Sequence, residues 1–239
     1  MKIHSVVIAL GLLLASAVAQ AQAPSVGRAS RLTGDQVSSA QAPGGPVRKL
    51  AEGNPVFAGE RIRTGGGTVL EIEFNDKSRF TLGPNTEFEV ERFSQAAGGS
   101  SGEEAFTSRV FKGAFRFVSG LIAKNKRENV RITTAVATIG IRGTHFEGEV
   151  TERQQKDGKT VDASAKVALL EPEGSDAGNA IVVANKFGSV TIDKPGYGTE
   201  IPDEKSPPSP VKRLQLRTIE NLQRSLRPSG PTGGPMRRF

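Results

Sequence analysis

An all-β fold of many short strands is the class that this sequence predicts, and three observations support it. Apolar and polar residues alternate along several short segments, as in strands with one buried face. Gly, Pro, Asn and Asp residues divide these segments at intervals of roughly eight to twelve residues, which is typical of a sandwich, a barrel or a solenoid. Between residues 31 and 201 no long segment has the 3.6-residue period of a helix.

The first residues predict an export signal. Lys2 precedes an apolar run from Val6 to Val18, and Ala19-Gln20-Ala21 has the small-x-small form of a signal-peptidase site. The run has about 13 residues against the roughly 20 that span a bilayer, so we expect a cleaved signal peptide over residues 1–21 rather than an anchor. The mature protein is therefore expected to be soluble and secreted, or periplasmic in a Gram-negative bacterium.

The remaining elements follow from the same patterns. Residues 22–46 are expected to hold a mobile leader over Pro24–Ser30, a first strand near Arg31–Val37 and a loop over Ser38–Pro46, and a β-domain follows over residues 47–201. The further expected strands are residues 69–74, 79–82, 87–91, 110–111, 114–118, 130–133, 167–170, 181–183 and 190–192, with an exposed loop over 95–104, a charged turn over 124–128 and a hairpin tip over 154–159.

A corner is predicted around Arg142. Gly140 and Gly143 lie inside strand-like sequence, where glycine marks a bulge or a sharp bend. One strand is expected to end near Ile141 and the next to run from Thr144 to Val150, so the corner can join two β-layers. Arg142 could be a buried or capping ion-pair partner at this corner or an exposed contact, and we favour the structural role. Along the second strand the alternation predicts one face toward the core and one toward solvent, the latter made of His145, Glu147 and Glu149.

The residue inventory disfavours several kinds of chemistry. The chain has no cysteine, and His145 is the only histidine outside the expected signal peptide, so thiol catalysis and histidine metal sites are disfavoured. His145 beside Glu147 suggests a catalytic pair, but no nucleophile can be placed next to them and a surface histidine is favoured. The glycines after Thr64 lack the ending of a phosphate loop and are expected to form a turn. No cofactor or metal is expected.

Glutamates on alternating positions allow two interpretations. They could be paired carboxylates for glycoside hydrolysis or calcium ligands. Alternation also explains them as the outer faces of strands, where charge discourages aggregation, and we favour this interpretation. The residues concerned are Glu71, Glu73, Glu87, Glu89 and Glu91.

The chain past residue 201 has a different composition. Residues 202–239 are expected to form a Pro-rich linker and a basic tail, with one helix over Val211–Arg227. Residues 203–239 carry +5 of the formal net charge of +7, from eight Lys or Arg against three acids. The tail is expected either to be a partly disordered extension or to bind an anionic polymer or membrane surface. Its candidate contact residues are Lys212, Arg213, Arg217, Arg224 and Arg227.

Two regions resemble the FecR domain, a periplasmic β-domain named after an iron-dicitrate signalling regulator. Leu50–Gly65 and Ile72–Thr86 are similar to the pattern L-x-x-G-x-x-V-x-x-G-[DE]-x-I-x-T, an apolar strand, a polar turn and L-G-P-N-[ST]. Thr134–Phe146 is similar to T-P-x-A-x-x-x-[VI]-R-G-T-x-F. Lys77 and Ala135 stand where Gly and Pro are common. The motif residues are Gly59, Thr64, Gly83, Asn85, Arg142, Gly143, Thr144 and Phe146.

The resemblance implies an all-β domain of solenoid or jelly-roll character that acts by protein contact. Regulators of this family are expected to have a cytoplasmic segment and then a transmembrane helix, whereas here the apolar run begins by residue 6. We therefore expect a secreted FecR-domain protein without the sigma-regulator architecture, which binds an unknown envelope protein in signalling or assembly. The alternatives are a module that binds envelope glycan or a surface polymer, and an envelope hydrolase. Nucleic acid is not an expected partner, because Trp is absent and Tyr197 is the only Tyr.

Overall fold

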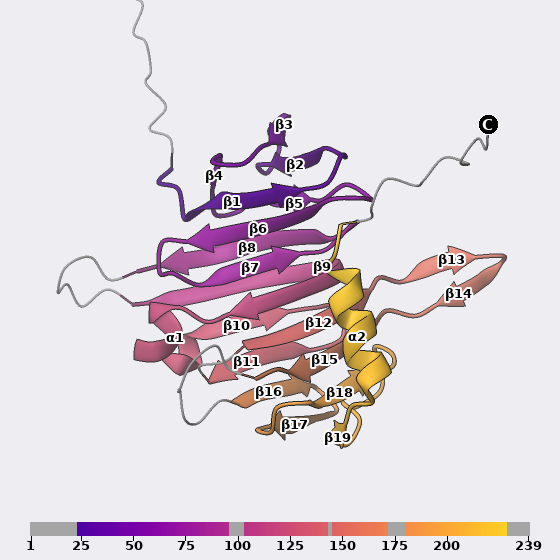
Figure 1. Ribbon diagram of the computed structural model, residues 1–239. Helices are drawn as coiled ribbons and strands as arrows, with labels where there is room; N and C mark the ends of the chain where they lie inside the picture. The colour runs from indigo at the N-terminus through magenta and orange to yellow at the C-terminus, as the bar shows by residue number, and fades with distance from the viewer. Residues whose placement is uncertain (1–22, 96–102, 143–144, 172–179, 229–239) are drawn as a thin grey trace, which may run out of the picture.

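The computed structural model describes residues 23–95, 103–142, 145–171 and 180–228, which form a sandwich-like pair of β-sheets (Figure 1). The all-β prediction is confirmed, and of its architectures the described residues form the sandwich rather than a solenoid or closed barrel. Sheet A has the order β4 (Pro55–Val56), β1 (Gly27–Thr33), β6 (Val69–Phe74), β7 (Arg79–Leu82), β9 (Ala105–Val118), β12 (His145–Thr151), β15 (Ser164–Leu169), β18 (Tyr197–Ile201) and β19 (Lys212–Arg213).

Sheet B lies against sheet A. Its strands pair in the order β3 (Val47–Leu50), β2 (Ser38–Gln41), β5 (Arg61–Arg63), β8 (Glu87–Ser94), β9, β10 (Val130–Thr133), β11 (Thr138–Arg142), β16 (Ala180–Asn185) and β17 (Gly188–Ile192). The β9–β10 pair is parallel, and the other pairs of the two sheets are antiparallel.

Strand β9 belongs to both sheets. Its first half pairs with β8 and β10 in sheet B, and its second half pairs with β7 and β12 in sheet A. The change of sheet falls near Gly113, whose φ of +98° suits glycine and where an added Cβ would lie 2.2 Å from Thr86 Oγ1. The two strands expected over 110–118 are therefore one strand that bends.

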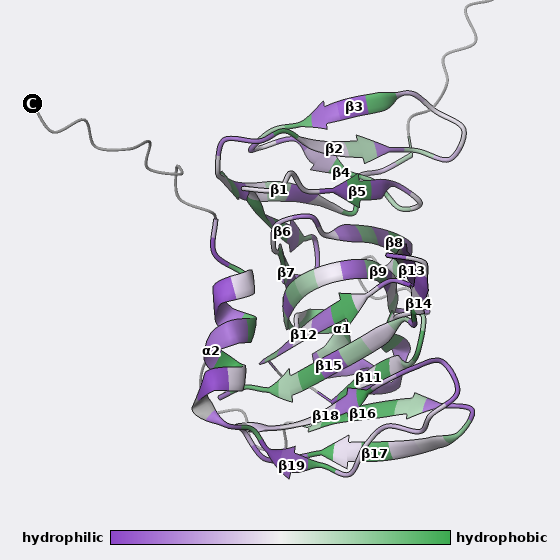
Figure 2. Cartoon of the chain, turned by 90° about the vertical axis from the view of Figure 1, so that its right-hand side faces the viewer, coloured by the Kyte–Doolittle hydropathy of each residue, from purple (hydrophilic) through white to green (hydrophobic). Residues whose placement is uncertain are grey.

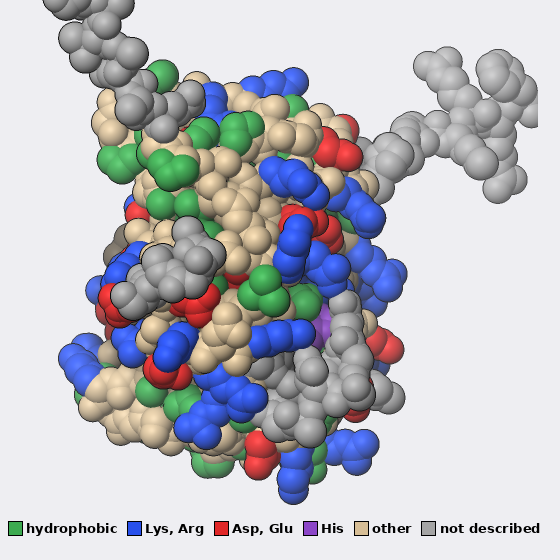
Figure 3. Space-filling model, turned by 90° about the vertical axis from the view of Figure 1, so that its left-hand side faces the viewer, with side chains coloured by type: hydrophobic (Ala, Val, Ile, Leu, Met, Phe, Trp, Pro, Cys, Tyr) green, Lys and Arg blue, Asp and Glu red, His purple; other side chains and the backbone are tan. Residues whose placement is uncertain are grey.

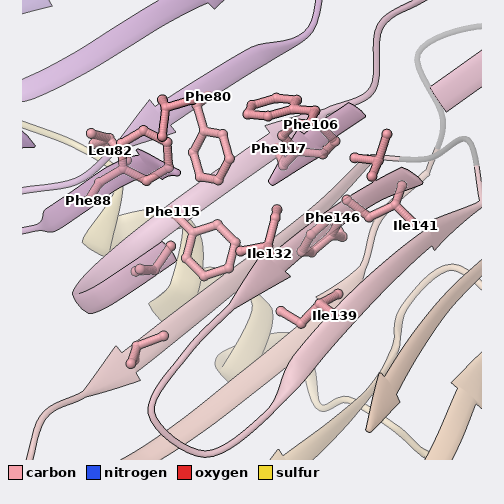
Figure 4. Close-up of a cluster of buried hydrophobic side chains, with 14 of the residues drawn as sticks. Phe80, Leu82, Phe88, Phe106, Phe115, Phe117, Ile132, Ile139, Ile141 and Phe146 are labelled. Carbon is pink, nitrogen blue, oxygen red and sulfur yellow. The ribbon is translucent and has the colours of Figure 1, made fainter. Parts of the chain in front are cut away.

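Phenylalanine fills the space between the sheets (Figure 4). Phe80 of sheet A contacts Phe88 of sheet B with ring centroids 4.5 Å apart, and Phe117 of sheet A contacts Phe106 of sheet B at 5.7 Å. Burying each ring stabilises the fold by about 1.5–3 kcal/mol relative to exposure. The fully buried rings are Phe74, Phe80, Phe88, Phe106, Phe115, Phe117 and Phe146.

A short helix closes one end of the sandwich. Helix α1 (Leu121–Asn125) and a 3₁₀ turn, η1 (Arg127–Asn129), replace the charged turn expected over 124–128. Ile122 is buried, and the Leu121 N–H donates to the Asp76 carbonyl at 2.7 Å, in the turn between β6 and β7. The helix was missed because five residues are too few to show a helical period.

The N-terminal residues are more ordered than expected. Residues expected as a leader form β1, which pairs with β6, and part of the expected loop forms β2, which pairs with β5. Ala29 and Ala40 are completely buried on these strands. Small residues fit this end of the sandwich. A segment rich in small residues also has the composition of a loop, so these strands were not predicted.

The C-terminal residues also pack on the sandwich. Pro208 is buried, and the Thr199 hydroxyl donates to the Ser209 carbonyl at 2.6 Å. Residues 202–210 therefore lie against the β-domain. Helix α2 (Leu216–Ser225) then lies along the outside of sheet A (Figures 1 and 2). It is shorter than the expected 211–227, because residues 212–213 pair with β18 as β19.

One hairpin stands apart from both sheets. Strands β13 (Gln154–Lys156) and β14 (Lys159–Val161) pair with each other and project from the body in Figure 1, as the predicted hairpin tip implied. Ion pairs of Arg153 with Asp162 and Glu204 hold its base. Within the described ranges, no helix is long and apolar enough to cross a membrane.

Candidate functional site under the C-terminal helix

Several motif residues hold turns together. The Thr64 hydroxyl donates to the Gly83 carbonyl at 2.6 Å and accepts the Thr86 N–H at 2.9 Å, which joins the end of β5 to the β7–β8 turn. Asn85 in that turn has a φ of +54°, which Asn tolerates better than most residues. Gly59 has a φ of +80°, and its N–H donates to the Val90 carbonyl at 2.7 Å. These four residues therefore have structural roles.

The predicted corner connects the two sheets. Strand β11 belongs to sheet B and β12 to sheet A, so the chain changes layer between Arg142 and His145. Phe146 is buried beside Phe115, with ring centroids 5.9 Å apart. Arg142 is exposed and forms no ion pair with any described residue, so its expected role as a structural ion-pair partner stays a prediction. Gly143 and Thr144 lie outside the described residues.

Four of the five outward glutamates are paired with basic residues, and the fifth, Glu71, accepts a hydrogen bond from Ser30. Arg61 binds Glu87 and Glu89, each at 3.1 Å, and Arg63 binds Glu87 at 3.0 Å. Burial opposes ionisation of Glu87, but the hydrogen bonds and charges of Arg63 and Arg61 outweigh it and lower the pKa of this carboxyl group. The remaining pairs are Glu71 with Ser30, Glu73 with Arg28 and Lys77, and Glu91 with Arg109.

These contacts favour the interpretation as outer faces over paired catalytic carboxylates. On the face in Figure 3, basic and acidic side chains are likewise interspersed. Within the described ranges, no group of three or more Asp, Glu or His residues is placed to hold a metal ion.

Strand β12 is buried on both faces from His145 to Gly148, contrary to the prediction of a solvent face, whereas Glu149 is half-buried. His145 is 9% exposed and Glu147 is completely buried. The reason is α2, which contacts β12 from outside sheet A. The expected surface histidine is therefore wrong: the His145 ring lies beneath the helix, with Nδ1 3.2 Å from the Glu171 carbonyl oxygen.

Glu147 forms a buried ion pair with Arg116. The two residues are directly opposite each other on β12 and β9. Glu147 Oε1 accepts an N–H from Arg116 Nε at 2.7 Å and another from Nη2, whereas Oε2 has no hydrogen-bond partner among the described residues. Burial raises the pKa of the Glu147 carboxyl group, and the Arg116 guanidinium offsets only part of that rise.

A cleft of about 770 Å³ lies between this pair and α2. Arg116 and His145 form its inner wall, and Ile219 and Gln223 of α2 form its outer wall. Its remaining lining residues are Leu170, Glu171, Pro195, Gly196, Arg213 and Leu214. The site therefore combines one fixed arginine with apolar side chains, an arrangement suited to binding.

Close backbone approach holds α2 over the cleft. A Cβ on Gly83 would lie 2.3 Å from the Ser225 carbonyl oxygen, and one on Gly198 would lie 2.8 Å from Leu214 Cδ1. Leu222 and Leu226, which lie on the apolar side of the predicted helix, are buried against the sheet. The five basic candidates, by contrast, are all exposed: Lys212, Arg213, Arg217, Arg224 and Arg227. Their binding role stays a prediction.

The fold and the site define a non-solenoid, all-β sandwich domain with a helix-covered cleft. Residues 60–170 match the model of the FecR protein family, so this part of the chain is similar to FecR proteins. The match includes Arg116 and Glu147 and ends before α2.

Solved structures are also similar to this chain. Two crystal structures of a proposed anti-sigma factor from Parabacteroides distasonis align with it at 10% sequence identity and a TM-score of 0.46. Each alignment covers 67% of this chain and 62% of the other, so the chain spans less than two thirds of the length of that protein. No curated protein matches the sequence.

Proposed function

We propose that this protein is a secreted or periplasmic, non-enzymatic module whose FecR domain binds a protein partner in the cell envelope, in signalling or assembly. The FecR domain supports a regulatory role through protein interaction. The export signal predicted over residues 1–21 supports the compartment.

One observation carries the proposal: a rigid arginine–phenylalanine patch on the outer face of sheet B. The Arg61 guanidinium lies 3.8 Å from the centroid of the Phe111 ring, while its N–H groups are held by Glu87 and Glu89. Arg109 lies 5.8 Å from the same centroid. Arginine and aromatic residues are enriched at the centres of protein interfaces, and ordered side chains lose less entropy on binding.

The test is cross-linking in cells followed by mass spectrometry. We expect the wild type to trap one dominant envelope protein and the Arg61→Ala/Phe111→Ala variant to trap at least about fivefold less, since hot-spot truncations cost more than 1 kcal/mol. The matched control replaces Arg217 and Arg224 of α2 and Arg227 just after it with Gln, all three exposed. Trapping by the sheet B variant at the wild-type level would refute this patch as the interface.

A second candidate function rests on the exposed basic residues of β19 and α2 and on Arg227 just after the helix. They would attach the protein to an anionic envelope polymer, and the observation that favours this is that all five are exposed. Retention on purified lipopolysaccharide or cell wall that disappears in the triple Gln variant would support this function. Such a variant tests it better than deletion of residues 203–239, because deletion would also expose the apolar contacts of Leu222 and Leu226.

A further inference from the structure

The cleft beneath α2 has the size of a ligand site. Its volume of about 770 Å³ is roughly twice that of four other clefts, which measure about 360–430 Å³. Sites for small organic ligands usually enclose about 300–1,000 Å³ between apolar walls with a few fixed polar groups. The cleft has a volume in this range, and residues from sheet A and from α2 line it on opposite sides, with apolar and fixed polar groups among them.

Arg116 is the fixed polar group. Two of its five N–H groups bind Glu147, which leaves three N–H groups without a partner among the described residues. Because Glu147 holds the Nε side of the guanidinium, the Nη1 side stays available, and the Arg116 side chain is 33% exposed where it lines the cleft. A guanidinium held in this way presents a planar pair of donors that matches a carboxylate.

The other walls define the rest of the ligand. Arg213 lines the cleft and forms no ion pair with any described residue, whereas Glu171 is the only acid among the described lining residues. Glu147 behind the wall offsets the charge of Arg116, so the cleft suits one negative charge better than a polyanion. Leu170, Leu214 and Ile219 supply an apolar surface.

We propose that this cleft binds a monocarboxylate with an apolar body, with Arg116 and Arg213 as partners of the carboxylate. Glu147 is a positioning residue, and it explains why a buried ion pair is present on a sheet face. The ligand is either a free organic acid or the C-terminal residue of a peptide, which share this chemistry. The proposal goes beyond partner binding on sheet B, which needs no ligand in this cleft.

Calorimetric titration of the full chain tests the proposal. Octanoate represents the free acid and acetyl-Ala-Leu the peptide C-terminus, and the amide of each is the matched neutral probe. We expect saturable binding of at least one acid, and binding of its amide weaker by about tenfold, because a charge-assisted bond is lost. The acid that binds more tightly identifies the source of the carboxylate.

Variants locate the binding. We expect Arg213→Gln, and separately the double variant Arg116→Gln/Glu147→Gln, to weaken binding by about tenfold each. The double variant removes both charges together, so that no carboxylate stays buried without its partner. Arg131→Gln, exposed on sheet B, is the control and should leave the affinity unchanged.

Three results would overturn the proposal: amides that bind as well as acids, folded variants with wild-type affinity, or no saturable binding of either acid. These results are distinguishable from a failure of the proposed function, because the cross-linking experiment tests the sheet B patch without these probes.

Discussion

Glu147 shows how a single residue can be costly to the fold and useful to the site. Its carboxylate is completely buried with one oxygen unpaired, and such a group costs several kcal/mol of desolvation that an ion pair recovers only in part. A hydrophobic pair at the Arg116 and Glu147 positions would stabilise the sheet as well or better. The presence of this ion pair is therefore better explained by the need to orient the Arg116 side chain than by a gain in stability.

The raised pKa of Glu147 predicts a pH dependence of stability. A folded-state pKa above the ordinary 4.5 means that the folded protein holds this proton more tightly than the unfolded chain. The stabilisation is complete below the unfolded pKa and is lost as the pH rises through the folded pKa. We therefore expect the free energy of unfolding of the wild type to fall, relative to Glu147→Gln, as the pH rises above about 4.

Urea denaturation at a series of pH values measures this difference. Subtracting the Glu147→Gln curve removes the titration of groups shared by both proteins, including Glu87, whose lowered pKa acts in the opposite direction. A difference in the free energy of unfolding that stays constant with pH would contradict a raised pKa of Glu147 in the folded protein.

Strand β9 is the element that joins the two layers, and Gly113 is the residue that permits it. Alanine at a positive φ costs about 1–2 kcal/mol by itself. At Gly113 the new Cβ would also meet Thr86 at 2.2 Å, so we expect Gly113→Ala to lower the free energy of unfolding by about 3 kcal/mol or more.

Gly158 provides the matched control for this substitution. It has a φ of +72° at the hairpin tip, with nothing within 4 Å of an added Cβ. Gly158→Ala should therefore lose about 1–2 kcal/mol, the conformational cost alone. Urea denaturation of both variants gives the comparison, and equal losses would show that Thr86 moves aside without cost.

At the scale of the whole molecule, the shared strand and the phenylalanine core predict one folding unit. Phe80–Phe88 and Phe106–Phe117 contacts cross between the sheets, so neither sheet can keep its core without the other. We expect a single calorimetric transition in which the measured enthalpy equals the van't Hoff enthalpy. Two resolved transitions would mean that the sheets unfold separately.

The sequence predicted much of this architecture. Strands β6, β7 and β10 lie where alternation placed them, and the corner near Arg142 does change sheets. These features depend on neighbouring residues, whose periodicity can be read directly.

The candidate site could not be predicted in the same way. Alternation placed Glu147 in solvent, but its burial depends on α2, which is about 70 residues further along the chain. Arg116 was part of a predicted strand, yet no local signal paired it with Glu147, because cross-strand register is a tertiary property. Glycines at positions 83 and 198 were visible in the sequence, but only the structure shows that each gives room to the C-terminal segment.

The close approach of Ser225 to Gly83 has a consequence for the order of synthesis. Residues near position 225 are synthesised long after the β7–β8 turn that they cover. The outer face of sheet A, with its ion pair, therefore stays exposed to water until the C-terminal segment is available. During that interval the apolar positions later covered by Leu222 and Leu226 are open to chaperones and to other chains alike.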